Sequence, residues 1–138
     1  MKSVVVGKRF TFEASHFLPF HKGKCSNIHG HRYELTVYVR KSWRSGITQE
    51  EGMVVDYGVL TKAVEEVIIN ELDHKHLNDL DCVSSKHFLN PTAENLILWI
   101  AEKLQTHLTD KGLYLMEVQL KETENSFCIW RHDHGEVL

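Results

Sequence analysis

Residues 29–41 read HGHRYELTVYVRK, an alternation of apolar and polar side chains that is typical of a β-strand with one buried face. His29 and His31 are two residues apart, so their side chains point to the same face as the apolar residues that follow. At a rise of about 3.3 Å per residue, the two imidazoles lie about 6–7 Å apart, close enough to converge on one ion. This stretch therefore predicts both a central strand and a candidate metal site.

Upstream of this strand, residues 3–17 alternate in the same way and predict a first strand. His16 shares its parity with Phe10, Phe12 and Ala14, so we expect its imidazole on the buried face of that strand. Residues 18–28 carry turn-forming residues and predict a loop that contains Cys25.

Downstream, two helices are followed by two further strands. The first helix is expected after an N-cap at Asp56 and extends to Leu72, and the second begins near Pro91-Thr92 and ends at about Leu108. Residues 113–121 and 126–131 predict strands joined by a tight turn. In the first of these two strands, the residues expected to face inward are Tyr114, Met116, Val118 and Leu120.

The order strand–strand–helix–helix–strand–strand (ββααββ) predicts an α+β fold. We expect a four-stranded antiparallel sheet with both helices on one face. Such a sheet has an uncovered face and two unpaired edges, and this favours oligomerisation.

Length and composition limit the class of protein. A chain of 138 residues predicts a single domain covering residues 1–138. A net charge of −3 argues against nucleic-acid or membrane partners, and no apolar run is long enough to span a bilayer. No signal-peptide pattern opens the chain, and three cysteines without paired spacing suit reduced thiols, so we expect a cytoplasmic protein.

His16, His29 and His31 all fall on the buried parity of two adjacent strands, where an unpartnered imidazole is costly. This placement favours a shared metal over three separately hydrogen-bonded histidines. Three nitrogen ligands are typical of an open catalytic zinc site, and zinc is favoured over iron or copper. Cys25 is either a fourth ligand or a reactive thiol, because Lys22 and Lys24 beside it favour the thiolate.

Four more residues are candidates for chemistry, each with a simpler explanation beside it. Asp73-His74 follows the first helix, where the histidine either complements the helix dipole or forms an acid–histidine pair that carries protons. Glu122 continues the inward parity of its strand and is either a solvated strand end or an acceptor for a ring edge with paired N–H donors. Thr92 caps the second helix or contacts a ligand, and capping is favoured.

Taken together, these motifs resemble one family over nearly the whole chain: the 6-pyruvoyl-tetrahydropterin and 6-carboxy-tetrahydropterin synthases. Three residues separate Cys25 from His29, and this gap is similar to that of the bacterial carboxy enzymes of queuosine synthesis. The segments that carry the resemblance are His16, residues 25–33, residues 52–57, residues 72–78, residues 91–95 and Glu122-Thr123.

The resemblance implies a tunnelling fold, in which sheets from several subunits close an oligomeric barrel, commonly a hexamer of two trimers. It implies zinc on His16, His29 and His31, and proton transfer by Cys25, Asp73 and His74, with active sites shared between subunits. Glu122 would anchor a pterin, with Thr92 as a secondary contact. The implied substrate is 7,8-dihydroneopterin triphosphate.

Three functions therefore remain open. The first is a zinc-dependent lyase that forms 6-carboxy-tetrahydropterin and releases acetaldehyde and triphosphate. The second is a 6-pyruvoyl-tetrahydropterin synthase, which keeps the three-carbon side chain. The third is a non-catalytic module that binds a pterin or a metal.

Overall fold

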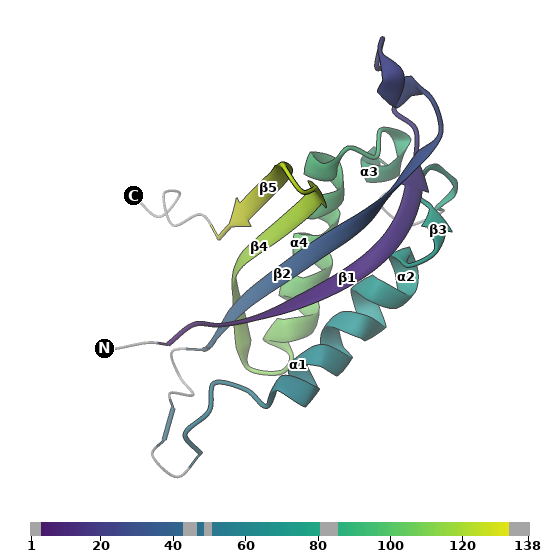
Figure 1. The fold of residues 1–138 in the computed structure, drawn as a ribbon. Helices are drawn as coiled ribbons and strands as arrows, with labels where there is room; N and C mark the ends of the chain where they lie inside the picture. The colour runs from purple at the N-terminus through teal and green to yellow at the C-terminus, as the bar shows by residue number, and fades with distance from the viewer. Residues whose placement is uncertain (1–3, 43–46, 49–50, 81–85, 133–138) are drawn as a thin grey trace.

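A single twisted sheet runs through the computed structural model, which describes residues 4–42, 47–48, 51–80 and 86–132 (Figure 1). The strands are β1 (Val6–His16), β2 (His29–Lys41), β3 (Lys75–His76), β4 (Leu113–Thr123) and β5 (Ser126–Arg131). The helices are α1 (Tyr57–Val64), α2 (Asn70–Leu72), α3 (Lys86–Leu89) and α4 (Ala93–Thr109), with the short turns η1 (Lys24–Ser26), η2 (Glu65–Ile69) and η3 (Leu77–Asp79).

The two long N-terminal strands form the centre of the sheet, as the sequence predicts. β1 and β2 are antiparallel and stay in register from Val6 opposite Val39 to His16 opposite His29. Every second residue of β1 from Phe10 onward is buried, which confirms the predicted parity. The strand order is β3-β1-β2-β4-β5, so the ends of β1 and β2 that carry the histidines lie side by side.

The predicted α+β fold is confirmed, but the sheet has five strands instead of the expected four. β3 is only two residues long and pairs with β1 in parallel. Lys75 lies opposite Ala14, and His76 lies opposite Ser15. The chain reaches this position because His74 adopts a left-handed backbone conformation, with φ of 61°, and its N–H donates to the carbonyl of Glu13 at 2.6 Å. A strand of two residues has no alternation that a sequence pattern could reveal.

The inward side of β4 is predicted correctly only in its second half. Val118 and Leu120 are buried, but Leu113 and Leu115 are buried in place of Tyr114 and Met116. The register against β2 shifts between these halves: Tyr38 lies opposite Glu117, and Val39 lies opposite Leu115. Met116 is thus the extra residue of a β-bulge, which reverses the parity of the residues before it.

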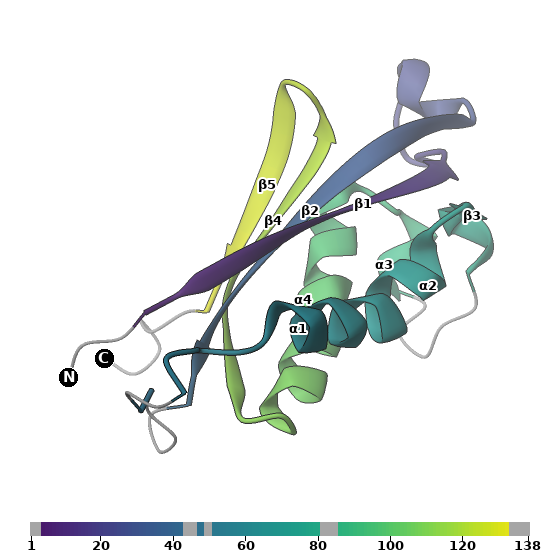
Figure 2. The same ribbon diagram turned by 60° about the horizontal axis from the view of Figure 1, so that its bottom comes forward.

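The helices pack on one face of the sheet, while the other face is uncovered (Figure 2). Both predicted N-caps are present: the Asp56 side chain accepts from the N–H of Gly58, and the Thr92 hydroxyl accepts from the N–H of Asn95. The helical segment that begins with α1 continues through η2, a π-helical turn, into α2. It ends at Leu72, as predicted. The large apolar residues of these helices that are 0% exposed are Leu60, Val64, Ile68, Leu72, Leu96, Ile100, Leu104 and Leu108. Burying such a side chain fully contributes about 1.5–3 kcal/mol.

The uncovered face of the sheet is mostly polar and carries ion pairs between neighbouring strands, such as Arg9 with Glu34 and Arg131 with Glu117. On β5, however, Phe127 and Ile129 remain exposed. The sheet is open in one chain, so closure into a barrel would require other copies. No helix in the described part of the chain is long and apolar enough to cross a bilayer.

Candidate functional site

Three imidazoles meet where β1 ends and β2 begins. The antiparallel register places His16 opposite His29, and His31 follows two residues later on the same face. One ring nitrogen from each residue lies within 4.8 Å of the other two, and the Nε2 atoms of His16 and His29 are 3.1 Å apart. The structure therefore brings together the three predicted metal ligands.

Backbone carbonyls fix the orientation of two of these rings. His16 Nδ1 lies 2.7 Å from the carbonyl oxygen of Pro91, and His29 Nδ1 lies 2.6 Å from that of Asn27. A carbonyl oxygen only accepts hydrogen bonds, so Nδ1 must be the protonated nitrogen in both rings. In a neutral imidazole the Nε2 atom then carries a lone pair, and both lone pairs point into the cluster.

Burial favours the neutral form of His16 and His31. His16 is fully buried, and desolvation lowers its pKa below the ordinary value despite the opposing Pro91 carbonyl. Desolvation also lowers the pKa of His31, whose Nε2 is buried and has no hydrogen-bond partner among the described residues. Facing lone pairs at 3.1 Å repel each other unless a cation lies between them, so the donor set fits a divalent metal.

Glu122, near the end of β4, reaches the same cluster. Its Oε1 atom lies 3.4 Å from His16 Nε2 and 3.3 Å from His31 Nε2. This confirms the inward parity predicted for Glu122, whose side chain is a quarter exposed and contacts the histidines. The direct contact with the histidines was not predicted, because it depends on how β4 aligns with β2.

The Tyr33 ring packs against the rings of His16 and His31. The sequence analysis did not predict this contact. Its ring is fully buried, lies 5.6 Å from the ring of His31 and stacks on Phe12 at 4.9 Å. Burial raises the pKa of its phenol far above the ordinary value, and the negative charge of Glu122 adds to this effect. Tyr33 therefore stays neutral and walls one side of the site.

Asp73 and His74 form the predicted acid–histidine pair. Asp73 Oδ2 lies 2.9 Å from His74 Nδ1, and Asp73 Oδ1 accepts from the backbone N–H of Glu13 at 2.9 Å. This backbone hydrogen bond and the contact with His74 lower the pKa of the Asp73 carboxyl group. His74 also holds the left-handed conformation described above, which is uncommon outside glycine and is found often at functional sites.

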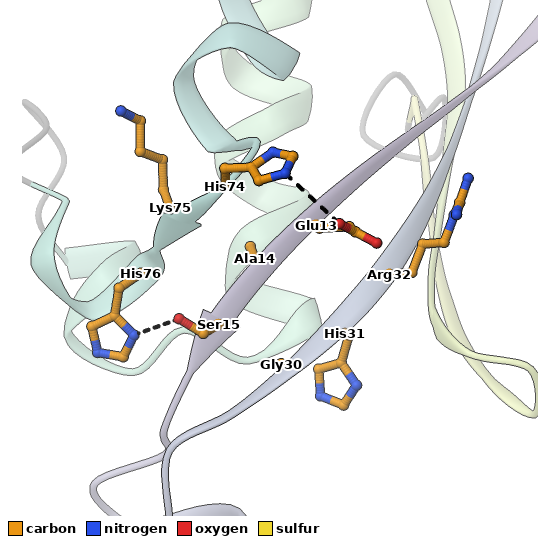
Figure 3. A pocket seen from close by; sticks show the side chains of 9 residues that line it. All are labelled: Glu13, Ala14, Ser15, Gly30, His31, Arg32, His74, Lys75 and His76. Carbon is orange, nitrogen blue, oxygen red and sulfur yellow. Dashed lines mark hydrogen bonds and ion pairs between the residues drawn. The ribbon is translucent and has the colours of Figure 1, made fainter.

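A pocket of about 610 Å³ opens beside this pair, between β3, β1 and β2 (Figure 3). His74 lies on one side with Glu13, and His76 forms a hydrogen bond of 2.9 Å with the Ser15 hydroxyl. The Ser15–His76 contact was not predicted, because it exists only through the short parallel strand. His31 is the one predicted metal ligand among the residues that line the pocket.

Cys25 lies in η1, within the connection between β1 and β2, and its side chain is half-buried. Its carbonyl oxygen accepts from the N–H of Leu18 at 2.8 Å, which closes the loop. Among the described residues, its thiol makes no hydrogen bond with the histidine cluster or with the Asp73–His74 pair. One chain thus presents the thiol and the acid–histidine pair as separate groups.

Thr92 takes the simpler of its two predicted roles, since its hydroxyl accepts from the N–H of Asn95 at 3.1 Å and caps α4. The residue before it, Pro91, supplies the carbonyl that orients His16. The N-terminus of α4 is therefore tied to the candidate metal centre, and Thr92 lies near it without a demonstrated ligand contact.

Cys128, on β5, should resist alkylation at neutral pH. Burial, with smaller contributions from Glu94 and Glu122, raises the pKa of its thiol from 9.0 to about 11. At pH 8 this lowers the thiolate fraction, and so the rate of reaction with iodoacetamide, by about a hundredfold. Peptide mass spectrometry of the folded protein over a pH series should show the Cys128 rate still rising above pH 9. A rate equal to that of the urea-unfolded chain would contradict the assignment.

The matches to known proteins agree with this geometry. The family model for 6-pyruvoyl tetrahydropterin synthase matches residues 5–133. The chain belongs to the 6-pyruvoyl tetrahydropterin synthase family. It is an enzyme of this family, and the resemblance noted from the sequence motifs is confirmed.

The similar proteins carry names that specify different products, a carboxy- or a pyruvoyl-tetrahydropterin. A 6-carboxy-5,6,7,8-tetrahydropterin synthase from Synechocystis is 39% identical over 114 residues, covering 83% of this chain and 84% of its own. A 6-pyruvoyl tetrahydrobiopterin synthase from Dictyostelium discoideum is 32% identical over 140 residues, covering 94% and 97%. The structure of Caenorhabditis elegans 6-pyruvoyl tetrahydropterin synthase superposes with a TM-score of 0.79 at 26% identity, covering 96% and 98%.

Proposed function

We propose that this enzyme is a zinc-dependent 6-carboxy-5,6,7,8-tetrahydropterin synthase. It would convert 7,8-dihydroneopterin triphosphate and water into 6-carboxy-tetrahydropterin, acetaldehyde and triphosphate. The observation that carries the proposal is the convergence of three imidazole nitrogens beside the Glu122 carboxylate, in a chain 39% identical to a relative with that name. The three-residue gap between Cys25 and His29 supports the same branch.

His16, His29 and His31 would hold the metal, and imidazole donors suit zinc. When bound, a divalent metal would act as a Lewis acid toward the hydroxyl oxygens of the substrate side chain. The carbonyls of Pro91 and Asn27 would support the metal indirectly, because they accept from the Nδ1–H groups of His16 and His29 and so fix the ring tautomers.

Glu122 would orient the pterin. The ring edge of a pterin presents a 2-amino group and an N3–H, which are paired donors that match one carboxylate. Glu122 keeps a quarter of its side chain exposed, so a ligand can reach it. Thr92, beside Pro91, would provide a secondary contact through its hydroxyl.

Cys25 and the Asp73–His74 pair would carry the proton transfers. The Cys25 thiolate would remove a proton from the substrate side chain, and His74, held by Asp73, would exchange a second proton. Hydrogen bonds from the Glu13 N–H and from His74 lower the pKa of the Asp73 carboxyl group, and this carboxylate would hold the His74 ring in position. Loss of triphosphate and cleavage of the side chain would follow.

These groups are separate within one chain, and we propose that oligomerisation joins them. The Asp73–His74 pair of one subunit would serve the Cys25 of a neighbour, in a homohexamer built as a dimer of trimers. The open sheet and the exposed Phe127 and Ile129 on β5 support assembly through the sheet edges.

A 6-pyruvoyl-tetrahydropterin synthase is the second candidate, favoured by the Dictyostelium relative at 32% identity. Both reactions would use the same early proton transfers, so the residues of the site support either. The difference lies in whether the side chain is cleaved.

Incubation of the zinc-loaded protein with 7,8-dihydroneopterin triphosphate, followed by identification of every product, separates the candidates. We expect acetaldehyde, triphosphate and 6-carboxy-tetrahydropterin in equal amounts. Triphosphate without acetaldehyde, together with a pterin that keeps all three side-chain carbons, would assign the pyruvoyl reaction. Tight pterin binding without release of triphosphate would contradict both proposed reactions.

A further inference from the structure

The Asn78 side chain holds both backbone hydrogen-bonding groups of Phe17. Its Oδ1 atom accepts from the Phe17 N–H at 2.9 Å, and its Nδ2 atom donates to the Phe17 carbonyl oxygen at 2.9 Å. A backbone N–H needs an acceptor and a carbonyl needs a donor, so a side-chain amide satisfies both groups at once. Asn78 is half-buried and lies in η3, directly after β3.

This contact begins where the pairing of β3 with β1 stops. The parallel register ends with His76 opposite Ser15, and two residues further along both segments Asn78 would face Phe17. The backbone turns into η3 after His76, and the Asn78 side chain supplies the two hydrogen bonds in place of a strand. The His76 ring also stacks on the Phe17 ring, with 6.0 Å between the ring centroids. The end of β1 is therefore held as far as Phe17.

Phe17 is the root of the loop that carries Cys25. This loop, residues 18–28, projects beyond the end of the sheet (Figures 1 and 2). Among the described residues, its hydrogen bonds join its own residues, apart from one to His29 at the start of β2. Directly after Phe17, the N–H of Leu18 donates to the Cys25 carbonyl at 2.8 Å. The position of Cys25 thus depends on how Phe17 is held.

We infer that Asn78 is a positioning residue for Cys25. The inference rests on the role of Cys25 in the proposed function. Asn78 fixes the peptide groups of Phe17, and Leu18, the next residue, holds the backbone of Cys25. A thiolate that removes a proton must lie at a defined place beside the substrate carbon, and a displacement of about 1 Å can cost about 10²-fold in rate.

The test uses the full-length, zinc-loaded enzyme and the variants Asn78→Ala and Asn78→Asp. The aspartate keeps an acceptor for the Phe17 N–H but loses the donor to the carbonyl. Asn70→Ala is the matched control, because Asn70 is exposed and its side chain makes no hydrogen bond within the described part of the chain. Circular dichroism and metal analysis verify each preparation.

The first readout needs no turnover. Hydrogen exchange measured by mass spectrometry should show residues 18–28 exchanging about tenfold faster in Asn78→Ala, because the root of the loop opens more often. The exchange of α4 should stay as in the wild type. Asn70→Ala should change neither segment.

The second readout is a double-mutant cycle with Cys25→Ala, measured as triphosphate release from 7,8-dihydroneopterin triphosphate. Asn78→Ala alone should lower kcat by about 10²-fold with little change in KM, since Glu122 would still hold the pterin. Asn78→Asp should lose less. In the Cys25→Ala background, Asn78→Ala should lower kcat by a further factor of about two or less, because two changes that act through one group are not additive.

Equal losses with and without Cys25, or unchanged exchange of residues 18–28, would overturn the inference and leave the proposed function standing. Loss of metal from Asn78→Ala would also overturn it, because the effect would then pass through His16. Should Asn78→Ala fail to fold, Asn78→Asp is judged by the same exchange experiment and the same cycle. Undiminished turnover in Cys25→Ala would overturn the proposed role of the thiol and this inference with it.

Discussion

Replacing Cys25 by alanine should lower kcat for triphosphate release by about 10²–10⁴-fold, the usual contribution of a positioned acid or base. The metal should stay bound, because the ligand set consists of histidines and Cys25 lies outside it. The fold should also persist, because the Cys25 side chain is only half-buried in a loop. Steady-state kinetics and metal analysis of the same preparation measure both effects.

Ser26→Ala is the matched control for Cys25→Ala. Ser26 lies in the same η1 turn, where its hydroxyl donates to the carbonyl of Gly23 at 2.8 Å. It should retain most activity, so a similar loss in both variants would point to a disturbed loop. Undiminished turnover in Cys25→Ala would remove the thiol from the chemistry. Loss of the metal would instead make Cys25 a ligand, the alternative that the sequence alone leaves open.

Replacing His29 by alanine should empty the metal centre and lower turnover by about 10³-fold or more, because a Lewis acid supplies several kcal/mol in the transition state. His29 suits this test better than His16: it is only partly buried at the start of β2, whereas His16 is fully buried. Metal content per chain and kcat/KM are the measurements.

His107→Ala controls for the loss of an imidazole. His107 lies on α4, is partly buried and pairs with Glu66 at 3.6 Å, within the helical layer. It should keep its metal and its turnover. A His29→Ala enzyme with a full complement of metal and normal turnover would show that the three-histidine centre does not act in catalysis.

The parts of the fold that follow from local patterns were predicted from the sequence. The alternation in β1 and β2 placed His16, His29 and His31 on one buried face, and the capping residues Asp56 and Thr92 marked the helix starts. These features depend on residues within a few positions of each other, so the local sequence pattern is enough to predict them.

The parts that depend on alignment between distant segments were not predicted. Met116 reverses the parity of β4 only because of its register against β2, and β3 exists only because His74 turns the chain toward β1. The contact of Glu122 with the histidines has the same origin. The predicted catalytic roles of Cys25, Asp73 and His74, and the predicted ligand contacts of Glu122 and Thr92, stay predictions.

The shortness of β3 has a thermodynamic consequence. β3 pairs with β1 only at Ala14 and Ser15, so from Val6 to Phe12 the outer edge of β1 has no strand neighbour among the described residues. If another copy supplies that neighbour, folding and association become one equilibrium. The melting temperature would then fall as the protein is diluted, and the tolerance of each chain to destabilising substitutions would depend on how much of it a cell makes.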